Sequence, residues 1–202
     1  LGGSAQNAAQ IKDAVASMPR TPGEKLVFIG YSKGATDVIE ALASNPQLAA
    51  QTAAVVTLAC VVSGTPIADD VPELLKKLAD LIMEGRCPPG YGRAIESLSR
   101  KERLTWLSAN ALPASVRFYS LAAFTDREGI SLILRSSYDK LALVDPRNDS
   151  QVTFHDALVP GGVLLGYINA DHRAVALAFN REHPAMAGKL KTRNAFPPDV
   201  QL

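Results

Sequence analysis

The sequence predicts an α/β fold in which a mostly parallel β-sheet is flanked by helices. Two observations lead to this prediction. Short, nearly continuous apolar runs recur along the chain, as expected for buried strands, and segments with helical periodicity lie between them. Strands that alternate with helices are typical of a parallel sheet covered on both faces. At 202 residues, the chain is expected to form one domain over 1–202 with a sizeable core.

The expected elements follow one another in a regular order. Strands are predicted over 25–30, 53–62, 115–124 and 163–169. Helices are predicted over 4–18, 33–44, about 127–143 and in a segment after residue 172. Ser4 is expected to cap the first helix, and Asn45-Pro46 to end the second.

One segment, about 65–112, departs from this rhythm because it separates two predicted strands by far more than a crossover needs. It contains two helical patterns rich in leucine. It is either a crossover with an additional helix packed on the core or a helical lid above a functional site. We expect a lid, since the segment emerges at the carboxyl ends of the strands, where open α/β sheets place their sites. Its leucines favour a substrate with an apolar portion.

Composition argues against several classes of function. The net charge of +1 gives no electrostatic basis for binding nucleic acid or an acidic membrane, and no apolar stretch is long enough to span a bilayer. Cys60 lies in an apolar run and is expected to be a small buried hydrophobe, whereas Cys87 lies in a predicted loop. A disulfide between them is left open by the sequence.

Residues 30–34 spell Gly-Tyr-Ser-Lys-Gly, which is a Gly-x-Ser-x-Gly motif between a predicted strand and a predicted helix. A sharp strand-to-helix turn of this kind can hold a serine in a strained, exposed conformation, known as a nucleophile elbow. Glycines permit the tight turn and the close approach of strand and helix. We therefore predict that Ser32 is a catalytic nucleophile; the alternative is an ordinary glycine-rich turn with a capping serine.

A serine hydroxyl needs a neighbouring base, and the chain has only three histidines. His172 follows the last predicted strand and would emerge at its carboxyl end, where the chain order Ser–acid–His places the base. His155 lies in an extended segment and is expected at the surface or in packing, and His183 lies in the C-terminal tail before a proline. We therefore predict His172 as the base.

The third member should be a carboxylate that orients the imidazole and stabilises its protonated form. The candidates are Asp145, Asp149, Asp156 and Asp171. Asp171 adjoins His172, which is an awkward position for reaching the far ring nitrogen. Asp145 and Asp149 share one polar loop, and the residue types alone do not separate them, although the proline after Asp145 suggests a turn-starting role for it.

These landmarks occur in the order found in the α/β-hydrolase superfamily, and over about 4–179 the chain resembles its bacterial lipases and esterases. A Ser-Gly-Thr-Pro segment at 63–66 belongs to the same series. Several such lipases carry the catalytic acid in an Asn-Asp-Gly-x-Val segment. Residues 148–152, Asn-Asp-Ser-Gln-Val, fit this pattern with Ser150 in place of glycine, so the resemblance favours Asp149 over Asp145. Ile67 and Lys33 also differ from the residues common in those lipases.

The resemblance implies a serine hydrolase that cleaves carboxylic esters through an acyl-enzyme, with no cofactor and no metal. In this fold the backbone N–H of the residue after the nucleophile, here Lys33, is one oxyanion-hole donor. The second donor should precede the nucleophile, but only about thirty residues do, and no His-Gly-Gly-Gly-like segment occurs. We therefore expect the chain to be the C-terminal part of a longer hydrolase, with its N-terminal part or a second chain beside the edge strand 25–30. The alternative function is a catalytically silent module that binds an apolar ligand or a partner.

Overall fold

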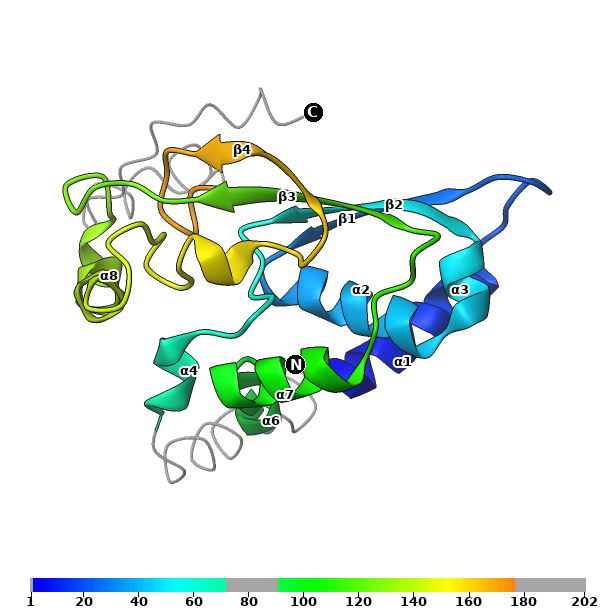
Figure 1. The fold of residues 1–202 in the computed structure, drawn as a ribbon, viewed down its shortest axis with the longest axis horizontal. Helices are drawn as coiled ribbons and strands as arrows, with labels where there is room; N and C mark the ends of the chain where they lie inside the picture. The colour runs from blue at the N-terminus through cyan, green and yellow to red at the C-terminus, as the bar shows by residue number, and fades with distance from the viewer. Residues whose placement is uncertain (1, 72–90, 177–202) are drawn as a thin grey trace.

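The computed structural model describes residues 2–71 and 91–176. Its centre is a four-stranded, fully parallel sheet with the strand order β1-β2-β3-β4 (Figure 1). The strands are β1 (Leu26–Tyr31), β2 (Thr52–Leu58), β3 (Arg117–Ala123) and β4 (Val163–Ile168). All four strands predicted from the apolar runs are therefore present, with ends that differ by at most four residues.

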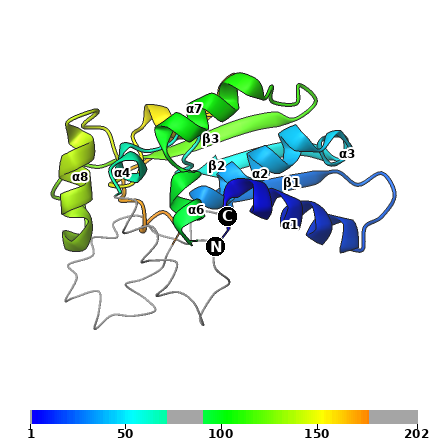
Figure 2. The same ribbon diagram turned by 90° about the horizontal axis from the view of Figure 1, so that it is seen from below.

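A layer of helices covers one face of this sheet (Figures 1 and 2). Its main members are α1 (Ser4–Ser17), α2 (Lys33–Ser44), α3 (Pro46–Ala50) and α7 (Arg100–Ala109). Shorter elements lie toward the carboxyl ends of the strands: α4 (Pro66–Asp69), α6 (Tyr91–Glu96), the 3₁₀ turns Leu132–Leu134 and His155–Ala157, and α8 (Arg135–Ala142).

Within residues 2–71 and 91–176, strand register separates a face covered by helices from a face with exposed apolar side chains. Phe28, Val55 and Phe118 are register partners across three strands, and they belong to the core cluster beneath α2. The next row along the strands includes Ile29 and Val163, which are 66% and 55% exposed. Alternate residues of a strand point to opposite faces, so this second row lies on the other face of the sheet.

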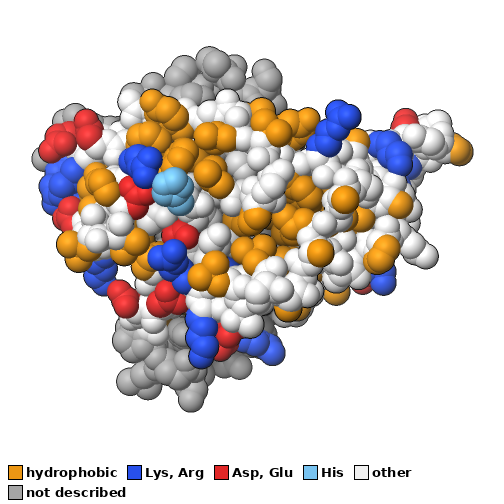
Figure 3. Space-filling view, in the orientation of Figure 1, with side chains coloured by type: hydrophobic (Ala, Val, Ile, Leu, Met, Phe, Trp, Pro, Cys, Tyr) orange, Lys and Arg blue, Asp and Glu red, His pale blue; other side chains and the backbone are white. Residues whose placement is uncertain are grey.

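The prediction that β1 is buried on both faces is therefore wrong for the described part of the chain. Strand order supplies the physical reason. Parallel crossovers are nearly always right-handed, so successive strands added in one direction place all their crossover helices on the same face. Figure 3 shows hydrophobic side chains gathered at the surface over the β4 edge of the sheet. Sequence periodicity indicates that a strand is apolar, but it contains no information on the order in which strands pair.

Two helix predictions also need correction. Ser4 is the first residue of α1 rather than its cap; Gly3 holds the cap position, without a side-chain hydrogen bond. The helix expected over about 127–143 is shorter, because residues 126–129 form a turn in which the Asp126 carboxylate accepts the N–H of Gly129 at 2.8 Å. Such local bonds from aspartate compete with helix formation.

Helix α7 is packed on the sheet layer. Trp106 and Leu107 contact the core cluster, and the buried Arg103 guanidinium pairs with Glu40 of α2 and donates from Nε to the Val62 carbonyl at 3.0 Å. The lid predicted over about 65–112 stays a prediction, and its residues 72–90 lie outside the described part of the chain, as does Cys87. Cys60 is a buried free thiol, and burial raises its pKa to about 12.

Candidate active site

Ser32 lies at the sharp turn between β1 and α2, at the carboxyl end of the sheet. Its backbone has φ 51° and ψ −130°, a conformation that L-residues rarely adopt. The preceding Gly30 makes the turn possible: a Cβ there would lie 2.6 Å from Cα of Ala35 and 2.8 Å from its Cβ. The first glycine of the motif therefore allows the close approach of strand and helix that the motif predicts.

Gly34, the second glycine of the motif, has no such role within residues 2–71 and 91–176. A Cβ at this position would meet nothing within 4 Å, and the residue is exposed in the first turn of α2. The expectation that both glycines serve close packing of strand and helix thus holds for Gly30 and is wrong for Gly34.

The structure brings His172 to Ser32 although their strands lie at opposite edges of the sheet. Nε2 of His172 lies 2.8 Å from Oγ of Ser32. The loop after β4 runs back across the carboxyl ends of the strands, where Ala170 and Val175 form a cluster with Leu58 and Tyr31. The imidazole is largely buried, with 7% of the residue exposed.

Asp149 is the carboxylate that reaches the other side of the ring. Its Oδ2 lies 2.7 Å from Nδ1 of His172, and its Oδ1 accepts the N–H groups of Gln151 and Val152 at 2.8 and 2.9 Å. The residue is fully buried. This geometry suits the imidazole tautomer in which Nδ1–H donates to the Asp149 carboxylate and Nε2 accepts from the Ser32 hydroxyl.

The other candidate acids are held elsewhere. Asp145 accepts from the backbone and guanidinium of Arg147; although burial alone would raise the pKa of Asp145, these bonds hold it below its usual value. Asp156 bonds Thr153 and Arg100. Its pKa is raised, chiefly because it is buried.

Asp171 is fully buried and anchors the loop that carries His172. Its carboxylate accepts the backbone N–H and the hydroxyl of Ser131, and also the N–H of Ala174 at 3.0 Å. His155 is exposed and contacts Arg147, as expected of a surface residue, and His183 lies outside the described residues.

Two features beside the nucleophile were missed by sequence reasoning. The Tyr31 hydroxyl donates to the main-chain carbonyl of His172 at 2.7 Å. The Lys33 side chain also has a partner on its own helix, since its Nζ lies 2.5 Å from Asp37 on the next turn of α2. The Lys33–Asp37 spacing of four residues is a recognisable signal for an ion pair on a helix. Nothing in the sequence indicates the long-range contact of Tyr31.

Lys33 is the first residue of α2, so its backbone N–H has no acceptor within the helix. This N–H therefore has the chemistry needed to stabilise a negative oxygen beside Ser32.

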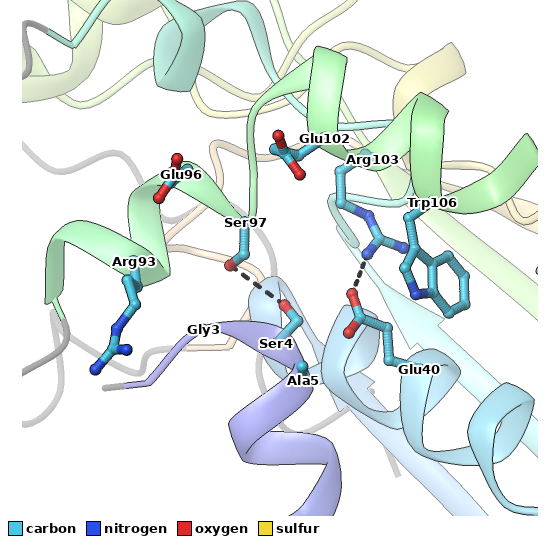
Figure 4. A pocket seen from close by; sticks show the side chains of 10 residues that line it. All are labelled: Gly3, Ser4, Ala5, Glu40, Arg93, Glu96, Ser97, Glu102, Arg103 and Trp106. Carbon is cyan, nitrogen blue, oxygen red and sulfur yellow. Dashed lines mark hydrogen bonds and ion pairs between the residues drawn. The ribbon is translucent and has the colours of Figure 1, made fainter. Parts of the chain in front are cut away.

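A separate hollow of about 310 Å³ lies between α1, α6 and α7 (Figure 4). Glu40, Arg103 and Trp106 form one side of it, with the Arg103 guanidinium stacked over the indole at 4.8 Å. Its lining contains none of Ser32, Asp149 and His172.

In the described ranges, no group of His, Cys, Asp and Glu side chains has the arrangement of a metal site. The same ranges contain no helix with the length and hydropathy needed to cross a bilayer.

Comparison with solved structures finds esterases and lipases. The metagenomic carboxyl esterase MGS0156 superposes with a TM-score of 0.87 and 45% identity, over 98% of this chain and 59% of that chain. The mature form of the Bacillus licheniformis lipase BlEst2 has a TM-score of 0.68 and 20% identity, over 94% of this chain and 75% of that one, which shows a shared fold. Its propeptide form gives a TM-score of 0.71 at 21% identity, over 94% and 41% of the respective chains. No protein-family model and no curated protein matches the sequence.

All three structures confirm the predicted fold. The resemblance to α/β-hydrolase-like esterases that the motifs predicted is confirmed by the carboxyl esterase at 45% identity. The chain spans about three fifths of the length of the esterase MGS0156.

Proposed function

We propose that this protein, similar over nearly all of its length to part of a carboxyl esterase, hydrolyses carboxylic esters through an acyl-enzyme on Ser32. The observation that carries the proposal is the pair of hydrogen bonds made by one imidazole. His172 contacts Ser32 through Nε2 at 2.8 Å and Asp149 through Nδ1 at 2.7 Å. A serine, a histidine and a buried carboxylate in this relation are the elements of a serine-hydrolase triad.

The mechanism follows from the roles of these groups. Nε2 of His172 removes the hydroxyl proton as Ser32 Oγ attacks the ester carbonyl carbon. The resulting imidazolium is stabilised by Asp149 and returns the proton to the departing alkoxide. Water then attacks the acyl-enzyme, with His172 again as the base, and releases the acid and free Ser32.

Negative charge develops on the carbonyl oxygen in both steps. The backbone N–H of Lys33 is one hydrogen-bond donor to this oxyanion. The partial positive charge at the N-terminus of α2 also stabilises the negative oxygen. The Lys33 ammonium, paired with Asp37, takes no part in this scheme.

We further propose that residues 65–112 act as a lid and that the substrate has an apolar acyl part. The support is the position of this segment after β2, at the carboxyl end of the sheet, together with its leucine-rich pattern. A small-molecule ester is the expected substrate class, in keeping with the carboxyl esterase among the similar structures.

Hydrolysis of p-nitrophenyl acetate by matched variants tests the triad. Asp149→Asn should lower kcat by about 10⁴-fold, because an amide favours the wrong imidazole tautomer. Asp145→Asn is the control in the same loop and should leave kcat nearly unchanged, since the Asp145 carboxylate is paired with Arg147. Ser32→Ala should abolish turnover. Loss of activity in the Asp145 variant alone would show that the acid is misassigned, and activity in Ser32→Ala would exclude the mechanism.

A further inference from the structure

Tyr31 occupies an unusual position, directly before the proposed nucleophile and in contact with the proposed base. Its hydroxyl donates to the carbonyl oxygen of His172 at 2.7 Å, across 141 residues of sequence. Its ring also lies beside the imidazole, with centroids 5.1 Å apart and planes tilted by 34°. The end of β1 therefore contacts both the side chain and the main chain of His172.

The main chain of His172 is held at two points. Its N–H donates to the carbonyl of Asp149 at 2.8 Å, and its C=O accepts from Tyr31. His172 therefore makes four hydrogen bonds in the site: two through its imidazole, to Ser32 and Asp149, and two through its main chain, to Asp149 and Tyr31. The bond from Tyr31 connects the His172 loop to β1, the strand that leads into the nucleophile.

The fold makes such a bond useful. His172 follows β4, at the opposite edge of the sheet from β1, so its loop must cross the carboxyl ends of the intervening strands. Asp171 fixes the loop on the far side, through Ser131. A displacement of about 1 Å between reacting groups can cost about 100-fold in rate, so an anchor on the Ser32 side matters for catalysis.

The surroundings keep the Tyr31 hydroxyl protonated. Burial, and then the negative charges of Asp149 and Asp171, raise the pKa of the phenol well above its usual value. The hydroxyl therefore remains a donor over the whole pH range in which an ester hydrolase of this type is assayed.

We propose that Tyr31 is a positioning residue that holds the His172 main chain so that its imidazole stays within hydrogen-bonding distance of Ser32. The inference rests on the proposed function and adds a residue that acts through the base rather than on the substrate. The proposed role depends on one hydrogen bond, from the Tyr31 hydroxyl to the main-chain carbonyl of His172.

Tyr31→Phe removes this bond and keeps the ring. We expect kcat for p-nitrophenyl acetate to fall about 10-fold with KM nearly unchanged, since the Tyr31 hydroxyl is bonded to the main chain of the base and is proposed to act through it. Tyr138→Phe is the matched control, because the Tyr138 hydroxyl also donates to a main-chain carbonyl, that of Pro146, at 3.3 Å. It should leave kcat unchanged, and both variants should melt at similar temperatures. Unchanged kcat in Tyr31→Phe would overturn the proposal.

A double-mutant cycle tests whether Tyr31 acts through His172. The rate at which a fluorophosphonate labels Ser32 is measured in Tyr31→Phe, in His172→Ala and in the double variant. We expect the Tyr31 change to slow labelling in the wild-type background and to have no further effect when the imidazole is absent. An equal effect in both backgrounds would show that Tyr31 acts independently of His172.

Proton NMR separates this proposal from the proposed function. The Nδ1–H of His172 that is bonded to Asp149 should give a downfield signal whether or not the protein turns over an ester. This signal should broaden in Tyr31→Phe and persist in Tyr138→Phe. An unaltered signal in Tyr31→Phe overturns the positioning role. The opposite combination is also informative. If the signal broadens in Tyr31→Phe but the parent protein hydrolyses no ester and its Ser32 is not labelled by a fluorophosphonate, the proposed function is overturned and the positioning role stands.

Discussion

Ser32 adopts a backbone conformation that costs free energy in any L-residue, and the residues around it show how the chain accommodates that cost. Gly30 lets β1 and α2 meet at distances that no other residue permits, since a Cβ at this position would lie only 2.6 Å from Cα of Ala35. Gly34 lies two residues after the serine, in open space within the described structure. The two glycines of one motif thus have different physical roles.

The difference predicts opposite results for two alanine substitutions. Gly30→Ala should lower the free energy of unfolding by about 1–3 kcal/mol, because the new methyl group meets backbone that must shift. Gly34→Ala should leave the free energy of unfolding unchanged or raise it by up to about 1 kcal/mol, since alanine favours helix. Urea denaturation of both variants measures this. Equal destabilisation by the two changes would contradict the distinction.

Ser150 is a second strained residue, beside the proposed acid. Its φ is 83°, in the region that favours glycine, and its buried hydroxyl has no hydrogen-bond partner within the described structure. The lipases that carry an Asn-Asp-Gly-x-Val segment have glycine where this chain has Ser150. The structure gives the reason why glycine suits the position.

Ser150→Gly should therefore stabilise the protein by about 1 kcal/mol, because it removes both the strained Cβ and an unsatisfied buried hydroxyl. Ser150→Ala should give a smaller gain, since it removes the hydroxyl and keeps the strain. Thermal and urea unfolding compare the two variants with the parent protein. If the glycine variant unfolds more easily than the parent, relief of strain at Ser150 does not govern the stability of this loop.

At the residue scale, the sequence predicted those site residues that a local motif or the order of elements along the chain can indicate. Ser32 was predicted from its motif and His172 from its place after the last strand, and the structure brings these two side chains together. Asp145 and Asp149 were inseparable by residue type, because both are aspartates in one loop; the resemblance to lipases favoured Asp149, and it is the Asp149 carboxylate that faces the imidazole. The contact of Tyr31 was missed because a hydrogen bond across 141 residues leaves no local signal.

At the scale of elements, strands were predicted well and their environment was not. Apolar runs identified all four strands, since burial of the covered face requires them. The face that no described helix covers escaped prediction because it follows from strand order, which periodicity does not encode. Ser4 was misplaced as a cap because its polar side chain resembles one, although it lies inside the first turn of α1.

Helix α7 shows that the segment after β2 is partly built into the body of the protein. Arg103, which is 1% exposed, pairs with Glu40 and bonds Val62, so it joins α7 to α2 and to the chain that follows β2. Removal of one partner from a buried ion pair is costly, because the other charge is left unpaired. If residues 65–112 include a lid, α7 is its fixed end.

An acyl-chain series of p-nitrophenyl esters tests the apolar lid. If leucines of residues 65–112 contact the substrate, kcat/KM should rise from acetate to medium-chain esters, by up to about threefold to fourfold per buried methylene. The ester series needs no variant, and Ser32→Ala corrects for spontaneous hydrolysis. Equal kcat/KM for acetyl and long-chain esters would show that no apolar acyl pocket forms.

At the scale of the whole molecule, one face of the sheet exposes apolar side chains, and the chain matches only part of a longer esterase. Four parallel strands added in one direction place their helices on one face, and apolar side chains such as Val27 and Ile29 remain exposed on the other, at 58% and 66%. The similarity to the esterase MGS0156 covers 98% of this chain but 59% of that one. The prediction that the N-terminal part of the same protein or a second chain lies beside β1 stays a prediction.

The central claim is that Ser32 is an activated nucleophile, and a fluorophosphonate probe tests it most directly. The folded protein is treated with the probe, digested and examined by mass spectrometry, with Ser32→Ala and Asp149→Asn in parallel. We predict one phosphonyl adduct, on Ser32, that is absent in Ser32→Ala and forms much more slowly in Asp149→Asn. A folded protein that remains unlabelled, or that carries its adduct on another residue, would contradict the claim.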